Sequence, residues 1–384
     1  MKSERAKKIS PSATLEITSR AKKMKKEGKD VVILAAGEPD FPTPRRIKDA
    51  AIKAIENNFT TYTPTSGIPE LKEAICKKFE RDNGLKYTTK EVMAHCGGKH
   101  ALYLAFQCLL NPKDEVILHI PYWNSYIEQV KLAEGLPVEI MSKPDMSLDM
   151  DQIKSSITDK TKVLLINSPS NPSGYVIKKE EALVIGEILL KNKDLFLISD
   201  EVYEYFIYEG KHINIASLFP ELKERILIVN AVSKSYSMTG WRLGYCAGPE
   251  ELISSMTSLQ DHMTSNPSSI SQIAAVEAIS GEQEDVKIML QEFTKRRSFL
   301  VDTLNRFPLI SCSPPGGAFY AFVNIEKTGM NSVTFADKLL SESLVAVIPG
   351  KAFGMDNYIR LSFAASREAL EKGVERIEKF LKTV

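Results

Sequence analysis

The chain has few cysteines, and they follow no regular spacing. Only five occur in 384 residues, and no two have the spacing of a Cys-x-x-Cys motif. A disulfide framework would need a regularly spaced, even set, and a zinc knuckle would need closely spaced ligand pairs. Neither is expected, and this cysteine usage is typical of a protein from a reducing compartment.

Long apolar runs and an excess of one charge are also missing. No run approaches the 18 apolar residues of a membrane span, and the basic N-terminus lacks the apolar segment of a signal peptide. We therefore expect a cytoplasmic protein with no membrane contact. The 50 basic and 49 acidic side chains nearly cancel, so no net field attracts nucleic acid, which favours a small-molecule enzyme.

Short apolar runs alternate with helical patterns through the middle of the chain, and this alternation predicts an α/β fold. A large domain, residues 46–290, would have a mainly parallel mixed sheet covered by helices. A smaller α+β domain would combine residues 1–45 and 291–384, with a long helix near 284–306. The expected strands are 92–95, 116–120, 163–166, 195–199 and 226–229, then 318–325, 345–348 and 358–363.

The last strand of the large domain leads directly to a lysine. Ser233 and Lys234 follow the apolar run 226–229, and Arg242 comes eight residues after the lysine. A partly desolvated lysine can lose its proton and form a Schiff base with an aldehyde, and an arginine can clamp a phosphate. An aldehyde with a phosphate suggests pyridoxal phosphate. Taken alone, a surface lysine with a salt-bridging arginine explains these residues equally well.

Ligands bind beyond the carboxyl ends of the strands in sheets of this class. Gly97, Gly98 and Lys99 follow one strand where a helix begins, as at many phosphate sites. Trp123 follows the next strand and could stack on a planar ring. The alternatives are an ordinary Gly-Gly turn and a core tryptophan.

Two further strand ends carry polar groups. A turn rich in proline could present the amide of Asn171 rigidly, or it could be a plain surface turn. Asp200 could hold a pyridine nitrogen protonated, with Tyr203 donating to the phenolic oxygen of the ring, or Asp200 could cap the next helix. Five consecutive strand ends thus carry groups that pyridoxal phosphate would need, which makes the separate alternatives jointly less favoured.

These residues match a known family in order and over nearly the whole chain. The sequence resembles the class I aminotransferases of fold type I, and in particular the bacterial aspartate aminotransferase subgroup. The matching segments are Pro11 to Thr14, Gly37 to Phe41, Tyr62 with Gly67 to Leu71, Gly97 to Lys99, Pro121 to Trp123, Asn167 to Gly174, Ser199 to Tyr203, the Lys234 segment, and Ile359 to Ser362.

The resemblance implies a role for each cofactor-binding residue. Lys234 would bind the cofactor aldehyde and later move a proton between the substrate Cα and the cofactor. Asp200 would pair with the pyridine nitrogen, Tyr203 and Asn171 would contact the phenolic oxygen, and Trp123 would stack on the ring. The phosphate would be held by Gly97, Gly98, Lys99, Arg242 and Tyr62, and a further hydroxyl contact either comes from Ser233 or is missing.

Tyr62 would act from a neighbouring subunit, which implies a homodimer with shared active sites. Arg360 would bind the α-carboxylate of the substrate, with Gly37, Asn171 and Trp123 beside it. Arg360 lies on the opposite strand face from Ile359 and Leu361, which suits a cleft or an exposed sheet surface. The implied reaction is ping-pong transfer of an amino group between L-aspartate and 2-oxoglutarate.

Two positions depart from the family pattern. The family usually has glycine or serine three residues before the lysine, where this chain has Ala231. Some relatives bind the side-chain carboxylate of aspartate with an arginine of the partner chain, and the matching segment here offers Asp261. In the bacterial subgroup a lysine at the position of Lys99 is implied to serve instead, which favours a dicarboxylic amino donor. Lys99 as an ordinary residue at a helix start is the alternative.

Several alternatives stay open at this point. The same cofactor residues would serve a C–S lyase of the same fold, or an aminotransferase for prephenate, aromatic amino acids or alanine. A non-catalytic pyridoxal-binding regulator would need a DNA-binding module, and too few residues precede Pro11 for one. A nicotinamide enzyme would need a GxGxxG motif, which the chain lacks. The sequence does not determine an oligomer beyond the dimer or whether the N-terminal segment closes over the site.

Overall fold

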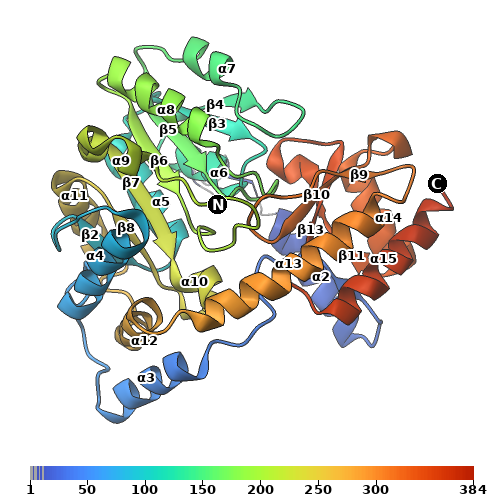
Figure 1. Cartoon of the computed structure of the whole chain (residues 1–384), viewed down its shortest axis with the longest axis horizontal. Coiled ribbons are helices and arrows are strands. Elements are labelled where there is room, and N and C mark those ends of the chain that lie inside the picture. Colours follow the sequence, from blue (N-terminus) through green and yellow to red (C-terminus); the bar gives the residue numbers. More distant parts are fainter. Residues whose placement is uncertain (1–2, 4–6, 8, 11–12) are drawn as a thin grey trace.

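The computed structural model describes residues 3, 7, 9–10 and 13–384. Figure 1 shows a part with a large central sheet and a C-terminal part, with the long helix α13 (Glu284–Leu304) running between them. Pro11 and Ser12, which belong to the first segment of the family resemblance, lie outside the described residues. Within residues 13–384 the strands form one large sheet and two smaller ones.

The large sheet has seven strands within residues 13–384, in the order β2-β8-β7-β6-β5-β3-β4. Strand β8 is antiparallel to both of its neighbours, and the other pairs are parallel. This confirms the predicted α/β fold with a mainly parallel mixed sheet. The strands are β2 (Val92–His95), β3 (Glu115–Ile120), β4 (Leu136–Met141), β5 (Thr161–Asn167), β6 (Phe196–Asp200), β7 (Ile226–Ala231) and β8 (Gly244–Ala247).

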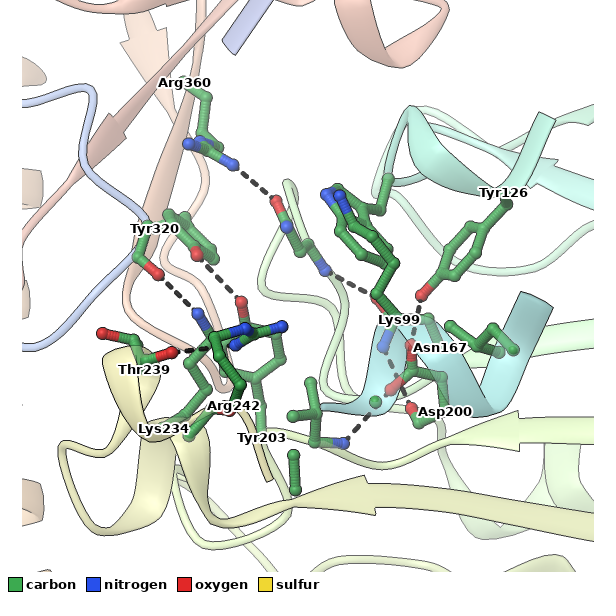
Figure 2. Close-up of a pocket in the computed structure, with 18 residues that line it drawn as sticks. Lys99, Tyr126, Asn167, Asp200, Tyr203, Lys234, Thr239, Arg242, Tyr320 and Arg360 are labelled. Carbon is green, nitrogen blue, oxygen red and sulfur yellow. Dashed lines mark hydrogen bonds between the residues drawn. The ribbon is translucent and has the colours of Figure 1, made fainter. Parts of the chain in front are cut away.

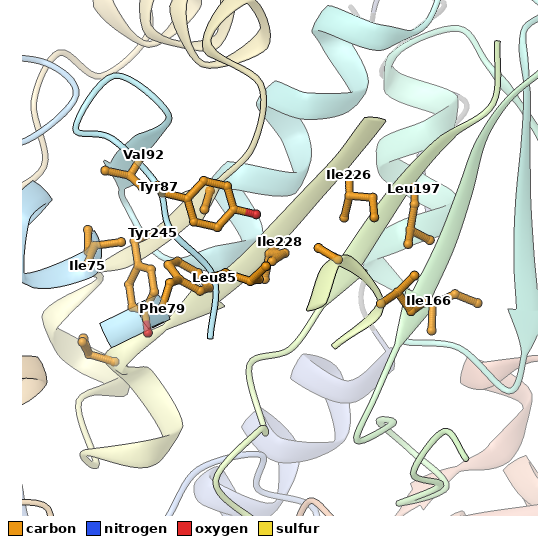
Figure 3. Close-up of a cluster of buried hydrophobic side chains, with 14 of the residues drawn as sticks. Ile75, Phe79, Leu85, Tyr87, Val92, Ile166, Leu197, Ile226, Ile228 and Tyr245 are labelled. Atoms are coloured by element: carbon orange, nitrogen blue, oxygen red, sulfur yellow. The ribbon is translucent and has the colours of Figure 1, made fainter. Parts of the chain in front are cut away.

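Both faces of this sheet are buried, as expected for a parallel sheet covered by helices. Ile226 and Ile228 of β7 belong to the hydrophobic cluster on one face, part of which Figure 3 shows, whereas Leu227 and Val229 belong to the cluster on the other. The helices of this part are α3 (Arg45–Glu56), α4 (Pro69–Asn83), α5 (Gly98–Leu109), α6 (Ser125–Leu132), α7 (Met150–Ser155), α8 (Lys179–Lys191), α9 (Ile215–Leu218), α10 (Val232–Ser235), α11 (Glu250–Asp261) and α12 (Ser269–Ser280).

The two smaller sheets join the two ends of the chain. One has the order β12-β13-β10-β9, and the other is the parallel pair β1-β11. Their strands are β1 (Val32–Ile33), β9 (Ser311–Cys312), β10 (Tyr320–Asn324), β11 (Val345–Ala346), β12 (Ile348–Pro349) and β13 (Tyr358–Ser362). The helices beside them are α2 (Ala13–Lys26), α14 (Ser332–Ser343) and α15 (Arg367–Leu381). The domain division at residues 45/46 and 290/291 stays a prediction, and α13 runs through its second boundary.

Two strands of the large sheet were not predicted from the sequence. Strand β4 contains Pro137 and lies at the sheet edge, where a missing N–H is tolerated. Strand β8 has four residues and begins with Gly244, whose Cβ would lie 2.4 Å from the backbone nitrogen of Gly98. A proline and a glycine within the two segments hid their extended conformation.

No helix in the described part of the chain is both long enough and apolar enough to cross a bilayer. The five cysteines are all free thiols. The structure therefore relies on packing around the sheets rather than on disulfides.

Candidate active site

The carboxyl ends of β5, β6 and β7 open into a pocket of about 200 Å³. Figure 2 shows side chains converging on it from both parts of the molecule: Arg360 and Tyr320 from the C-terminal sheet, and Asp200 and Tyr126 from the large-sheet part. The site therefore depends on how the two parts are held together.

Lys234 lies in the short helix α10, directly after β7. Its ammonium donates a hydrogen bond to the carbonyl of Gly37, 2.6 Å away. Burial lowers the pKa of Lys234 to about 8, and the positive charges of Arg360 and Arg242 act in the same direction, against the opposing charge of Glu38. This amine is thus easier to deprotonate than an ordinary lysine, as a nucleophile or a base needs to be.

Asp200 is the last residue of β6, and its carboxylate is buried. The Tyr126 hydroxyl donates to Oδ2 at 2.7 Å, and the amide of Val202 donates to Oδ1 at 3.3 Å. Burial raises the pKa of Asp200 to about 6, while the hydrogen bond from Tyr126 lowers it. Turns rather than a helix follow β6, which excludes the helix-capping alternative for Asp200.

The start of α5 forms a cationic cradle next to the pocket. Gly97 has φ of +86°, and a Cβ there would lie 2.5 Å from Nη2 of Arg242. The first turn of α5 holds no acidic residue. The Arg242 side chain is exposed and donates to the Thr239 carbonyl at 2.8 Å, which places its charge beside the helix N-terminus. Free helical N–H groups with a nearby guanidinium form an anion site.

Lys99 lies on the same helix turn and contributes a second cation. Its ammonium nitrogen is 4.8 Å from the centroid of the Trp123 ring. Burial lowers the pKa of Lys99, and the charge of Arg242 adds to this effect. Trp123 lines the pocket and meets Tyr126 edge-on, with ring centroids 5.4 Å apart. Trp123 is therefore available to a ligand as an aromatic wall.

Arg360 reaches the pocket from β13 and is almost completely buried, with 2% of its surface exposed. Its Nη1 donates to the side-chain oxygen of Asn171 at 2.8 Å, and its Nη2 donates to the carbonyl of Ala35 at 3.1 Å. No negative side chain pairs with it among the described residues. A buried, charged and unpaired guanidinium suits a carboxylate ligand, and the exposed-sheet alternative is excluded.

Tyr203 and Tyr320 share a hydrogen bond between their hydroxyl groups, 2.8 Å apart. Both tyrosines are buried, and burial raises the pKa of Tyr203 well above its usual range. The backbone N–H of Asn171 donates to the side-chain oxygen of Asn167 at 2.9 Å, and the side-chain amide of Asn167 donates in turn to the Asp200 carbonyl at 3.0 Å. Polar contacts thus connect the ends of β5 and β6.

Most residues expected from the sequence line this one pocket: Gly37, Gly98, Lys99, Trp123, Asn171, Asp200, Tyr203, Ser233, Lys234, Arg242 and Arg360. Gly97 lies behind Arg242. Tyr62 is 89% exposed and lies outside the pocket of its own chain. Their roles toward a ligand stay predictions.

Four polar lining residues were not expected: Tyr126, Asn167, Thr239 and Tyr320. Asn167 and Tyr126 had a usable signal, because one ends a strand and the other lies three residues after Trp123 near a helix start. Tyr320 had none, since it lies in a run of buried strand residues.

The two departures from the family pattern are also visible. Ala231 lines the pocket without a hydroxyl group, whereas Ser233, which also lines it, has one. Asp261 ends α11 and accepts a hydrogen bond from the Thr65 hydroxyl, away from the pocket. Within its own chain, Asp261 therefore places no negative charge in the site.

The chain matches the family of class I and II aminotransferases over residues 29–377. An aspartate aminotransferase of Geobacillus stearothermophilus is 50% identical over 381 residues, 97% of each chain. An aspartate/prephenate aminotransferase of Nitrosomonas europaea is 42% identical over 99% of each chain.

Solved structures agree with these relatives. The aspartate aminotransferase of Rhizobium meliloti has a TM-score of 0.95 and 41% identity, covering 100% of this chain and 99% of its own. That of Thermus thermophilus with maleate has a TM-score of 0.95 and 39% identity over 99% of each chain.

Proposed function

The chain belongs to the class I and II aminotransferases, and from that premise we propose that it moves an amino group between L-aspartate and 2-oxoglutarate with pyridoxal phosphate as cofactor. One observation carries the proposal. A buried lysine with a pKa lowered to about 8 and a buried aspartate with a pKa raised to about 6 line one pocket beside a cationic cradle. Two strongly shifted titrating groups beside a cationic cradle in one cleft are typical of a functional site.

The residues present fit pyridoxal phosphate. Gly97 leaves room that a side chain would fill, so the phosphate would be held at the start of α5 by the backbone there and by Arg242 and Ser233. Asp200 would hold the pyridine nitrogen in its protonated form. Trp123 would cover the ring face, and Tyr203 and Asn171 would contact its phenolic oxygen. When bound, the cofactor supplies an aldehyde for amine exchange and an electron sink for the charge left at Cα.

The chain itself supplies proton transfer and substrate orientation. The Lys234 amine, once free, would take the proton from the substrate Cα and return it in the reverse direction. Tyr126 keeps the Asp200 carboxylate in its charged form by donating a hydrogen bond to Oδ2. Arg360 would bind the α-carboxylate, with Gly37 and Asn171 beside it. The two half-reactions would alternate at one site in a ping-pong mechanism.

The dicarboxylic substrate is proposed from Lys99 and from the relatives. Lys99 gives the pocket a cation besides Arg360 and Arg242, which suits the side-chain carboxylate of aspartate. The two bacterial relatives described above carry the names aspartate aminotransferase and aspartate/prephenate aminotransferase. Prephenate is therefore the second amino acceptor to test, since it also carries two carboxylates.

We also propose a homodimer. A tyrosine that is 89% exposed and outside its own pocket is available to a second copy of the chain, and Tyr62 would contact the phosphate there. Analytical ultracentrifugation should show a dimer. A Tyr62→Ala variant should stay dimeric but bind pyridoxal phosphate more weakly.

The test of the function replaces Lys234 by alanine. Turnover of aspartate with 2-oxoglutarate should fall by about 10³-fold or more, because nucleophile and base are lost together. Borohydride reduction of the wild-type protein loaded with cofactor should label Lys234, as read by peptide mass spectrometry. Lys72 is the matched control, because burial lowers its pKa too and it lies outside the pocket. Normal turnover in Lys234→Ala, or label on Lys72, would contradict the proposal.

A further inference from the structure

Tyr320 occupies a position in the site that the proposed mechanism leaves unused. It lies in β10, which pairs directly with β13, the strand of Arg360, and its side chain is almost completely buried. Its ring and its hydroxyl contact different functional groups. The Cζ of Arg360 lies 4.3 Å from the ring centroid, and the hydroxyl is 2.8 Å from that of Tyr203.

The ring contact restricts the Arg360 guanidinium. Asn171 and the Ala35 carbonyl accept hydrogen bonds from its two terminal nitrogens, both along the guanidinium edge. Tyr320 covers one face, and the Phe353 ring lies 5.1 Å from the same carbon. A buried cation over an aromatic face is stabilised and loses rotational freedom. The ring of Tyr320 therefore keeps Arg360 in the orientation that a carboxylate would meet.

The donor in the hydrogen bond between Tyr203 and Tyr320 is determined if Tyr203 donates its own proton to the cofactor. A phenol has one proton to donate. If Tyr203 gives its proton to the phenolic oxygen of the cofactor, the proton between the two tyrosines must come from Tyr320. A hydrogen bond donated by Tyr320 to Tyr203 would strengthen the hydrogen bond that Tyr203 donates to the phenolic oxygen. Gly37 makes room for this arrangement, because a Cβ there would lie 3.1 Å from the Tyr320 hydroxyl.

We propose that Tyr320 is a positioning residue with two separable roles: its ring orients Arg360 for the substrate carboxylate, and its hydroxyl orients Tyr203 toward the cofactor. This inference rests on the proposed function, since it concerns the same pocket. Figure 2 shows Tyr320 between Arg360 and the Tyr203 hydroxyl. The residue thus joins the C-terminal sheet to the strand ends of the large sheet.

The test compares Tyr320→Phe, which keeps the ring, with Tyr320→Leu, which removes ring and hydroxyl. Two quantities are measured on protein loaded with pyridoxal phosphate: the dissociation constant for maleate, and the pH midpoint of the visible absorbance change. Phe335→Leu is the control for loss of a buried ring, because Phe335 packs on Phe380 away from the pocket. Thermal unfolding checks that each variant is folded.

Tyr320→Phe should bind maleate within about twofold of wild type, because Arg360 keeps its ring contact. Tyr320→Leu should bind maleate about fivefold more weakly. The loss should stay moderate because the Phe353 ring still contacts Arg360. Both should shift the absorbance midpoint upward by about 0.5, since both lack the donor to Tyr203. Phe335→Leu should change neither quantity.

The two possible failures are distinguishable. Wild-type protein that binds no maleate, or an Arg360→Leu variant that binds it unchanged, would overturn the proposed function. If those two controls behave as expected, wild-type affinity in Tyr320→Leu or an unchanged midpoint in Tyr320→Phe would overturn the role of Tyr320 alone. Tyr320→Phe guards against loss of folding, because it removes one oxygen atom from the core.

Discussion

Asp200 and Tyr126 form a buried pair of acid and phenol that sets the charge at one end of the pocket. Burial alone disfavours the carboxylate, and the Tyr126 hydroxyl at 2.7 Å offsets part of that effect. Since a protonated Asp200 could not hold a pyridinium, the phenol matters for function as well as for packing.

Replacing Tyr126 by phenylalanine should therefore raise the pKa of Asp200 above its value of about 6. A charge-assisted hydrogen bond corresponds to a change of about 1 in pKa. The measurement is a pH titration of ¹³C-carboxyl-labelled protein by NMR, with Asp200→Asn to assign the signal. An unchanged titration midpoint in Tyr126→Phe would show that the hydrogen bond does not stabilise the charged form.

The pocket residues that could be predicted from the sequence are those that follow strands. Lys234, Asp200, Asn171, Trp123 and the Gly-Gly turn all end an apolar run or follow within a few residues of one, and one rule about parallel sheets places them together. Tyr320 reaches the pocket from a strand of another sheet. Its place there depends on packing between two parts of the molecule, which periodicity within one strand does not encode.

Among the elements, the segment 37–43 connects the pocket to α13. The Gly37 carbonyl accepts from Lys234, and Thr239 donates to Glu38 at 2.9 Å. Further along, Asp40 forms an ion pair with Arg296 of α13 at 2.7 Å. Arg296 is mostly buried and its Cζ lies 5.4 Å from the Phe41 ring centroid. The segment is thus held by the pocket at Gly37 and by α13 at Asp40.

Asp40→Asn should loosen this segment, because Arg296 loses a charged partner while Glu292 still holds it. Hydrogen exchange of peptides covering residues 36–44 should become faster by about tenfold, for a loss of about 1.4 kcal/mol in local stability. Asp49→Asn is the control, since its exposed ion pair with Arg45 contributes little. Equal exchange in both variants would mean that Arg296 does not hold the segment.

The predicted elements that were found have in common a long or strongly apolar pattern. Helix α13 and the central strands β5, β6 and β7 are examples, and burial on both faces makes such strands readable as continuous apolar runs. Edge strand β4 and short strand β8 give weaker patterns. Their extended conformation is decided by pairing with neighbours distant in sequence.

For the whole molecule, a buried charge network behind the site makes stability depend on pH. His212 contacts the Glu201 carboxylate at 2.7 Å, and Asn214 and Ser199 also donate to it. Although burial opposes it, the charge of Glu201 raises the pKa of His212, with Glu204 adding to the effect and Lys78 opposing it. The same pairing lowers the pKa of Glu201 despite its burial.

The raised pKa of His212 and the lowered pKa of Glu201 define the pH range in which this pair stabilises the fold. A raised pKa means that the His212 contribution is complete below the unfolded value of about 6.5 and is lost as pH rises through the folded value. The Glu201 contribution is complete above about 4.3 and is lost as pH falls through its lowered folded value. The pair should stabilise the fold most between those two values.

His212→Gln should therefore destabilise the protein near pH 5.5 by only about 2 kcal/mol, because Glu201 keeps its other donors. The destabilisation should become smaller as pH rises above 7, because His212 loses its proton there. Urea unfolding of both proteins at several pH values measures this. Lys382→Gln, which removes an exposed ion pair, should give a small difference at every pH. A difference for His212→Gln that grows above pH 7 would contradict the assignment.

We propose that this pocket transfers an amino group through Lys234, and a single half-reaction is the test. Protein loaded with pyridoxal phosphate is mixed with L-aspartate alone, and oxaloacetate and the visible spectrum are followed together. We expect one equivalent of oxaloacetate per site, loss of the cofactor's visible absorbance, and recovery of that absorbance when 2-oxoglutarate is added. Absence of product and of spectral change, or continuous product release without any 2-oxo acid, would contradict it.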